Sequence, residues 1–458
     1  MTVAPLLVLA PFLQDPSWNL LPSRRPEVRQ AAFEAATDSG DQRWLSPLVD
    51  LLAFAETAEE WYRILDAAGG ILGEDLRSME RPWRNLTLRL ATIDPLPSFK
   101  DAMGWKRELL MAKVDPRFAE LLAPGTPRRV GMDEIVWGGV GVEGIPSLLD
   151  PKTIDADEAD FLDPEEPVFG VYVNGSARAY PQRILDWHEM ANDIVGDVPV
   201  ALTYCTLCGA AVLYDRRIGE RTFGFRTSGL LQRSNKLMFD VQTRNLWNQL
   251  TGEPVIGSLA HSGLRLNVLP VVTTSWSAWK REHPDTDVVA LDTGYDRDYS
   301  AGAAYGDYFR SLETMFPAAG KRAEDAYADK ERLLIVRLGA RSAAFPLRSL
   351  VDSRIHNKEV DGEGIVLVVS EESGPDEVWP GWGPEPLPAS VRAYARGTNK
   401  FLLDEQGKLL DAAGQTWHRT EEALVGPKGQ RLDRLPSHGL FGFAWHSFYA
   451  EGAGATEK

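Results

Sequence analysis

Residues Val198 to Gly209 read Val-Pro-Val-Ala-Leu-Thr-Tyr-Cys-Thr-Leu-Cys-Gly, an apolar run that ends at the only two cysteines of the chain, Cys205 and Cys208. A short apolar run of this kind predicts a buried strand. The residues after Gly209, Ala-Ala-Val-Leu-Tyr-Asp, predict a second strand. We therefore expect the Cys-x-x-Cys loop to form a knuckle between two strands. In a thioredoxin-type site the motif instead opens a helix whose N-terminus stabilises the thiolate.

Turn and helix signals surround this run. Asn174-Gly175 lies between two alternating segments and is a strong hairpin signal. Short helices are expected from Pro181 to Asn192 and from Ser275 to His283. This mixture of strands and short helices predicts an α+β module over residues 167–291.

The C-terminal half repeats this plan. An offset of 345 − 180 = 165 residues lays Ala179-Tyr180-Pro181 on Ala344-Phe345-Pro346. The remaining matches, some after gaps, keep the same order: Asn192 with Asn357, Trp247 with Trp417, Leu269-Pro270 with Leu435-Pro436, and Trp279 with Trp445. Because the order is conserved, we expect a duplicated α+β fold. The second copy is expected over residues 331–450, after a connection over residues 292–330.

The duplication changes the polar positions. Cys205 falls on Ser370, Cys208 on Ser373 and His188 on Ser353, whereas Gly209 still meets Gly374. A structural ion that each copy needs should survive in both, so the pattern favours a single functional centre in the first copy. The alternative is that the second copy no longer needs a structural staple.

The N-terminal part has a helical period. From Arg24 to about Leu72 apolar residues recur every three or four positions, which predicts amphipathic helices. Proline in the first turn and a polar break at Asp38 give this part a resemblance to a HEAT-type repeat, with an ordinary bundle as the alternative. We expect a helical segment over residues 1–93 that offers a surface to a protein partner. An ordered, loop-rich lead-in is expected over residues 94–166.

Composition excludes several classes of function. The 66 acidic and 49 basic residues give a net charge of −17, which argues against binding to nucleic acid. No stretch approaches the ~20 apolar residues of a membrane-spanning helix. The sequence has neither a Walker loop nor a dinucleotide fingerprint, so no nucleotide cofactor is indicated.

The first residues leave two interpretations open. Val3 to Leu13 has the length of a signal-peptide core, but no basic residue precedes it and it contains two prolines. Residues 1–14 therefore predict either a signal peptide or an N-terminal arm, and the location of the protein stays open.

The cysteine pair predicts a centre for a soft metal ion. Two thiolates and one imidazole suit copper or zinc. His188 is the first candidate for the third ligand because it lies on the predicted helix before the cysteine-bearing strand. Met238 and His261 are weaker candidates. The leading hypothesis is metal binding, with a metal-dependent redox step as its extension.

Two other classes of function remain open. The protein fits a non-catalytic scaffold in which the cysteine pair is a staple, and it also fits metal-free thiol–disulfide exchange. Glu189, Asp193 and Asp240 are weak candidates for general acid–base work, because they lie in the first module among many other acidic residues.

Several motifs of the first module resemble one known family. They are Ala179-Tyr-Pro, His188-Glu with Asn192-Asp193, Tyr204-Cys-x-Leu-Cys-Gly, Ser228-Gly-Leu, and Trp247-x-Gln-Leu-Thr-Gly. Together they resemble the bacterial and archaeal family called domain of unknown function three-one-seven-nine. The resemblance is strong from Trp105 to Pro284, weaker to Tyr449, and absent from the helical N-terminus. It implies no activity, and it gives a slight lean towards an extracytoplasmic location.

Overall fold

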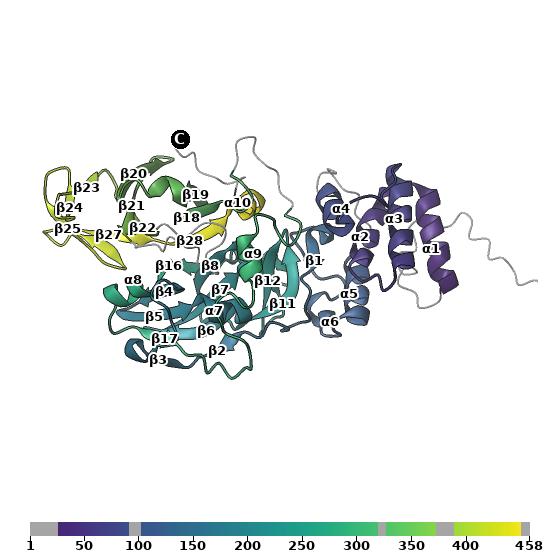
Figure 1. Cartoon of the computed structure of the whole chain (residues 1–458), viewed down its shortest axis with the longest axis horizontal. Helices are drawn as coiled ribbons and strands as arrows, with labels where there is room; N and C mark the ends of the chain where they lie inside the picture. The colour runs from purple at the N-terminus through teal and green to yellow at the C-terminus, as the bar shows by residue number, and fades with distance from the viewer. Residues whose placement is uncertain (1–25, 91–101, 319–326, 372–388, 450–458) are drawn as a thin grey trace, which may run out of the picture. The chain divides into compact units, whose positions relative to one another are not determined.

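The chain forms two compact units in a computed structural model that describes residues 26–90, 102–318, 327–371 and 389–449 (Figure 1). One unit is Met1–Trp137 and the other is Gly138–Lys458. The signal-peptide prediction for residues 1–14 lies outside the described residues, as do Ser373 and Gly374.

The first unit is helical. Its helices are α1 (Pro26–Ser39), α2 (Leu45–Leu52), α3 (Ala58–Leu72), α4 (Pro82–Leu90), α5 (Ala102–Lys113) and α6 (Phe118–Leu121). The side chain of Thr57 caps α3 by accepting a hydrogen bond from the Glu60 amide, and the helix ends at Gly73 in the left-handed region. The buried ammonium of Lys106 lies 3.0 Å from Asp50 and ties α5 to α2. The unit therefore includes helices from the expected lead-in as well as from residues 1–93.

The second unit begins with a hairpin. Strands β4 (Pro167–Val173) and β5 (Ser176–Pro181) are antiparallel, and Asn174 and Gly175 between them have φ of 48° and 86°. Both values are those of a type I′ turn, which asparagine and glycine adopt most easily. The predicted hairpin is confirmed.

Helix α7 (Gln182–His188) is shorter than the sequence predicts. It ends because Glu189 takes a left-handed conformation, with φ of 53°, and Met190 begins strand β6 (Met190–Val195). The prediction of a helix to Asn192 was wrong because the backbone of residues 190–195 pairs with the next strand instead.

The Cys-x-x-Cys loop joins two paired strands, as expected. Strand β7 (Val198–Cys205) runs antiparallel to β8 (Ala210–Asp215), and one short turn of 3-10 helix, Thr206–Cys208, connects them. Gly209 closes this knuckle in the left-handed region, with φ of 59°. The strands are the middle of a sheet in the order β15-β8-β7-β6-β2, where β15 is Asn267–Leu269 and β2 is Leu148–Leu149.

Further strands complete the first module. Four strands pair in the order β11-β12-β13-β14. They are β11 (Phe225–Gln232), β12 (Asn235–Asp240), β13 (Leu246–Asn248) and β14 (Pro254–Ile256). A third sheet has the order β16-β4-β5-β17-β3, where β16 is Val272–Ser275, β17 is Asp287–Val289 and β3 is Thr153–Asp155. Helix α8 (Trp276–Glu282) follows β16.

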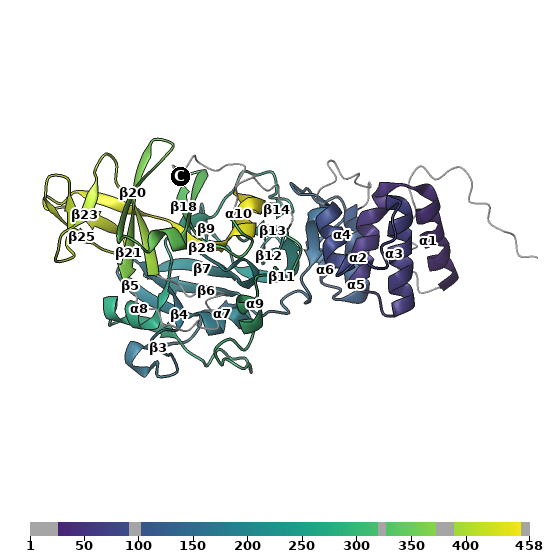
Figure 2. The same ribbon diagram turned by 45° about the horizontal axis from the view of Figure 1, so that its top comes forward.

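The second module repeats the same order of elements. Its elements are β18 (Arg332–Leu338), β19 (Arg341–Pro346), β20 (Ile355–Val360), β21 (Glu363–Glu371), β22 (Ala389–Ala395), β23 (Phe401–Leu403), β24 (Leu409–Asp411), β25 (Thr416–Arg419), β26 (Ala423–Val425), β27 (Arg431–Leu435), β28 (Ser437–Phe441) and α10 (Gly442–Phe448). The hairpin β18-β19 matches β4-β5, and β28 followed by α10 matches β16 followed by α8. Strand β28 packs against β8 and β16 of the first module (Figure 1). Figure 2 shows the two modules from a second direction.

Matched side chains make matched bonds in the two copies. Asn192 donates to the carbonyl of Phe225 and accepts from its amide, each over 2.9 Å. Asn357 makes the same two bonds with Phe401, over 2.7 and 2.9 Å. Each asparagine therefore positions the first residue of a strand, and the predicted α+β duplication is confirmed at the level of single hydrogen bonds.

A second matched pair involves tryptophan. The indole of Trp247 donates to Asp240 over 2.9 Å, and that of Trp417 donates to Asp411 over 3.0 Å. Each indole also meets a phenylalanine edge to face, with ring centroids 5.6 Å apart in the first copy and 5.3 Å in the second. These contacts stabilise the shared fold.

We expect Asn192→Ala to lower the free energy of unfolding by about 1–3 kcal/mol, because a buried amide that makes two backbone hydrogen bonds is lost. Asn357→Ala is expected to have a smaller effect because Asn357 is only partly buried. Urea denaturation measures both. The control is Asn267→Ala at an exposed position of β15. If Asn267→Ala lowers the free energy of unfolding as much as Asn192→Ala does, the stabilising role of the Asn192 hydrogen bonds is contradicted.

Candidate functional site

The two thiols lie together in the interior of the first module. Cys205 and Cys208 are 1% and 0% exposed, and their sulfur atoms are 3.1 Å apart. Both are free thiols in this structure. Two sulfurs at this separation can close to a disulfide with little movement, or can share a soft metal ion.

The turn between β11 and β12 forms one wall of the site. Arg233 and Ser234 both have positive φ, 48° and 65°, although neither is glycine. Residues other than glycine, asparagine and aspartate rarely adopt positive φ. Backbone strain of this kind is concentrated at functional sites. The turn brings the Ser234 carbonyl to 3.6 Å from the Cys208 sulfur and the Asn235 amide to 3.4 Å from it.

A buried polar network supports this wall. Asn235 donates to the side-chain oxygen of Gln249 over 2.9 Å. Gln249 donates in turn to the hydroxyl and the carbonyl of Thr203, over 3.0 and 3.1 Å, and to the carbonyl of Ala210. Thr203 and Ala210 belong to the two strands of the knuckle, so the network links the turn to both of them.

One buried ion pair lies beside the thiols. The ammonium of Lys236 is 3.6 Å from the Glu189 carboxylate, and it donates to the backbone carbonyls of Glu189 and Tyr204. Burial raises the pKa of Glu189, and Lys236 opposes that shift. Burial lowers the pKa of Lys236, while Glu189 and Cys205 oppose it. The charges of Glu189, Lys236 and Cys205 therefore influence one another's ionisation.

The thiols are electrostatically unequal. Burial and the charge of Glu189 raise the pKa of Cys205, but the hydrogen bond with Cys208 and the backbone amide and ammonium of Lys236 hold it below its usual value. Burial, the hydrogen bond to Cys205 and its charge raise the pKa of Cys208. The directions of the two pKa shifts favour a negative charge on Cys205 over one on Cys208.

The connection between the modules covers the knuckle. Tyr308 lies on α9 (Gly306–Arg310), and its hydroxyl donates to the carbonyl of Leu207, between the two cysteines, over 2.6 Å. Lys330 donates to the carbonyl of Tyr308 over 3.0 Å. Access of a solute molecule to the two sulfur atoms therefore depends on the position of α9.

His188 makes a different set of contacts from the one expected. Its Nδ1 donates to the Pro146 carbonyl over 2.7 Å, and its Nε2 accepts from the Tyr299 hydroxyl over 2.6 Å. A carbonyl only accepts, so this assignment of the ring proton follows. Burial lowers the pKa of His188. Both ring nitrogens are engaged, and the structure does not bring them together with the sulfurs.

The other predicted residues lie elsewhere in the module. Met238 is fully buried in β12 opposite Trp247, and His261 is exposed. Asp193 accepts from Arg178 over 2.7 Å and from the Tyr180 hydroxyl over 2.6 Å. Asp240 accepts from Thr243 and Trp247. Of the three acidic candidates, only Glu189 lies in the electrostatic surroundings of the thiols.

Sequence reasoning missed Asn235 and Lys236, at the start of β12, and the turn that precedes them. The turn contains no glycine and has no standard turn signature. A signal was available for Gln249, since it belongs to the Trp247-x-Gln motif. The same offset that pairs Trp247 with Trp417 lays Gln249 on Arg419.

The second module has a charged cluster in the corresponding place. Ser370, the counterpart of Cys205, accepts from Arg392 over 3.3 Å and from Arg419 over 3.0 Å. Arg419 is the counterpart of Gln249, so the thiol and its supporting amide have both been replaced, by a hydroxyl and a guanidinium.

Two carboxylates complete this cluster. Glu282 pairs with Arg392 and Arg419 over 2.9 and 2.7 Å, and Glu421 pairs with Arg392 over 2.6 Å and also with Arg434. Glu282 lies on α8, so the pairs join the first module to the second.

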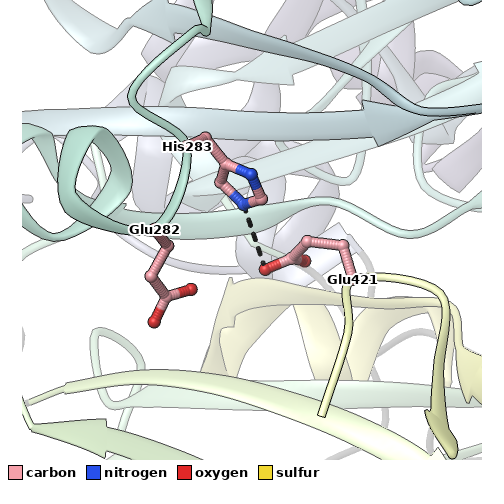
Figure 3. A group of neighbouring side chains, drawn as sticks. All are labelled: Glu282, His283 and Glu421. Carbon is pink, nitrogen blue, oxygen red and sulfur yellow. Dashed lines mark ion pairs between the residues drawn. The ribbon is translucent and has the colours of Figure 1, made fainter. Parts of the chain in front are cut away.

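Glu282, His283 and Glu421 are the one group in the described residues whose three potential metal-ligand atoms lie within 4.8 Å of one another (Figure 3). His283 Nε2 lies 3.5 Å from Glu421. Three guanidiniums already neutralise the two carboxylates, so a divalent cation there would meet net positive charge. The cluster is better explained as an ion-pair network between the modules than as a metal site.

A protein-family model described as "Protein of unknown function (DUF3179)" matches residues 142–452. The match covers both modules and the thiol pair, and it excludes the helical unit. No curated protein and no solved structure gives a significant match. Within the described part of the chain, no helix is long and apolar enough to cross a membrane.

We expect Glu421→Gln to lower the free energy of unfolding by about 3–5 kcal/mol at neutral pH, because removing one partner leaves buried guanidiniums uncompensated. Burial alone would raise the pKa of Glu421, but Arg434 and Arg392 hold it well below 4.5. A carboxyl whose pKa is lower in the folded than in the unfolded state stabilises the fold at pH values above its unfolded pKa. This contribution is lost as the pH falls towards the folded pKa. The difference between the two proteins should therefore shrink below about pH 4.5 in urea titrations.

The control for this network is Glu422→Gln, which removes an exposed carboxylate 3.5 Å from Arg431. Exposed pairs contribute about 0–1 kcal/mol. Equal losses in the two variants would contradict a buried network.

We expect Lys236→Met and Glu189→Gln to shift the pKa of the Cys205 thiol in opposite directions. Loss of the ammonium raises the pKa of Cys205, whereas loss of the carboxylate charge lowers it further. Alkylation by iodoacetamide at neutral pH should accordingly become slower in Lys236→Met and faster in Glu189→Gln, with mass spectrometry to locate the adduct. Circular dichroism checks that both variants are folded. A change of the same sign in both would show that altered access, and not charge, controls the thiol.

Proposed function

The chain belongs to the DUF3179 family of proteins of unknown function, and we propose that Cys205 and Cys208 form a two-electron dithiol–disulfide centre. The observation that carries the proposal is the asymmetric thiol pair. The sulfurs are 3.1 Å apart, and the environment favours the thiolate at Cys205 and the thiol at Cys208. A nucleophilic thiolate beside a resolving thiol is the arrangement that exchange chemistry requires.

The reaction is exchange with a low-molecular-weight disulfide, RSSR. The Cys205 thiolate attacks one sulfur of RSSR, the S–S bond of RSSR breaks, and RS⁻ leaves. Cys208 then loses its proton and attacks the Cys205 sulfur, which releases the second RS⁻. The protein dithiol is oxidised by two electrons to a disulfide, and RSSR is reduced to two thiols after protonation.

Glu189 is the proposed acceptor of the Cys208 proton. Burial raises the pKa of this carboxyl, so it can take up and return a proton under mild conditions. Its charge acts on both thiols and raises the pKa of each. Lys236 stabilises the negative charges on Glu189 and Cys205 before the reaction and the charge that moves from Glu189 to Cys208 when the proton is transferred.

The burial of both sulfurs limits the co-reactant to a small molecule. A folded protein disulfide cannot reach thiols that are 0–1% exposed without displacement of α9. Local opening of a short helix on a connection is a low-energy motion. A small aliphatic disulfide needs the least opening.

The experiment is to treat the reduced full-length protein with hydroxyethyl disulfide and to follow its mass. The wild type should lose two hydrogens and carry no adduct. Cys208→Ser should stop at a mixed disulfide on Cys205, and Cys205→Ser should react far more slowly. Unchanged free thiols in the folded wild type, while unfolded protein reacts, would exclude exchange chemistry and leave the pair as an inert structural element.

A soft metal ion is the second candidate ligand of the same thiols. Asn235 donates to the Cys208 sulfur, and such N–H groups also stabilise metal-bound thiolates. Cuprous copper suits a pair of thiolates, whereas zinc prefers four ligands. Because His188 is engaged elsewhere, copper fits this donor set better than zinc.

Elemental analysis of freshly prepared wild type and Cys205→Ser separates these two candidates. Stoichiometric copper in the wild type alone supports the metal centre. Metal-free wild type that exchanges with hydroxyethyl disulfide supports the dithiol. A protein that does neither is the scaffold, with its cysteines as a staple and its helical unit as the surface for a protein partner.

A further inference from the structure

The turn between β11 and β12 consists of two residues. Gln232 pairs with Asn235, so Arg233 and Ser234 alone connect the strands. Positive φ at both of them is the pattern of a type I′ turn, in which asparagine and glycine are the favoured residues. Arginine and serine are strained in this conformation, and a strained turn persists only where surrounding contacts determine it.

Those contacts come from outside the first module. The buried Ser234 hydroxyl donates to the carbonyl of Pro317, in the connection, over 2.9 Å. The guanidinium of Arg233 donates to the carbonyl of Ser447 over 2.8 Å, and Ser447 lies on α10 of the second module. Breaking the first bond would leave a buried hydroxyl without its partner, which is costly. The connection and the second module therefore hold the turn in place.

The turn acts on both sulfur atoms. The Ser234 carbonyl lies 3.6 Å from the Cys208 sulfur and 4.0 Å from the Cys205 sulfur. The side-chain amide of Asn235 donates to the Cys208 sulfur over 3.4 Å. A carbonyl accepts from an S–H group, and an amide N–H donates best to a sulfur that carries negative charge. A disulfide has neither an S–H group nor a charge, so these contacts stabilise the dithiol more than the disulfide.

We infer that Ser234 and Arg233 are positioning residues that set the redox equilibrium of the two thiols: they hold the turn against the sulfurs and so favour the dithiol. The inference rests on the proposed function, because it concerns the same two-electron couple. With glutathione as the reductant, the disulfide and two GSH give the dithiol and GSSG, and the protein gains two electrons and two protons. The second module thereby has a role, since α10 helps to determine the potential of thiols that the module itself lacks.

The test measures this equilibrium in the full-length protein. Samples are equilibrated in buffers of reduced and oxidised glutathione, quenched with acid, alkylated and analysed by mass spectrometry. Ser234→Ala removes the bond to Pro317 and should shift the equilibrium about tenfold towards the disulfide, which lowers the potential by about 30 mV. Arg233→Met should shift it in the same direction. The control is Ser262→Ala, which removes an exposed hydroxyl that also donates to a backbone carbonyl, that of Leu259, and it should keep the wild-type potential.

A third variant separates positioning from a general loss of stability. Ser234→Gly also lacks the hydroxyl, but glycine adopts positive φ without strain, so its shift should be smaller than that of Ser234→Ala. A loss of stability that is equal in the dithiol and the disulfide leaves the potential unchanged, because the potential reports their difference. Urea denaturation of both forms measures this directly. If Ser234→Ala does not fold, Arg233→Met decides, since its bond is only partly buried.

The wild type is the reference for both proposals. Wild-type protein that forms no disulfide in any glutathione buffer overturns the proposed function and this inference with it. If the wild type exchanges but folded Ser234→Ala and Arg233→Met keep its potential, the proposed function stands and the inference is wrong. A higher potential in either variant also overturns the inference, because the turn would then favour the disulfide.

Discussion

The buried ammonium of Lys236 is the interaction on which the first module's centre depends. It donates to the carbonyl of Glu189, where α7 ends, and to the carbonyl of Tyr204, immediately before the thiols. A charge in the protein interior is tolerated only when it is paired and hydrogen-bonded. This requirement holds the end of α7, the strand β7 and the β11–β12 turn in one arrangement, and it places a positive charge beside Cys205.

The duplication separates the parts of the module that build the fold from the parts that belong to the centre. The Asn192–Phe225 and Asp240–Trp247 pairs recur as Asn357–Phe401 and Asp411–Trp417, so they are structural. The thiol at position 205 and the amide at position 249 have become Ser370 and Arg419. Those changes occur together because the two positions face one buried space, where a change of one polar group alters what its neighbours can satisfy.

The modules act as one unit because they share buried interactions. Glu282 of α8 pairs with guanidiniums of the second module, and Phe441 packs against Gly209 at the knuckle. A cavity lined by residues of both modules lies between them. The second copy therefore supplies one side of the environment around the first copy's thiols, although it lacks thiols of its own.

The sequence alone was enough to predict the local and repetitive features of this protein. Apolar runs predict the strands on both sides of the cysteine knuckle, and Asn174-Gly175 predicts the hairpin. The constant offset predicts the duplicated α+β fold. These features can be predicted because they depend on residues close in the chain or on a repeated order of residues. The groups around the thiols depend on distant strand pairing. Asn235 and Lys236 lie beside the cysteines because the preceding turn has positive φ at Arg233 and Ser234. No turn signature in the sequence predicts this turn. His188, chosen as a metal ligand because it is near in sequence, has both ring nitrogens bonded to other loops. Tertiary structure decided the centre because long-range packing, and not sequence spacing, determines which buried charges must satisfy one another.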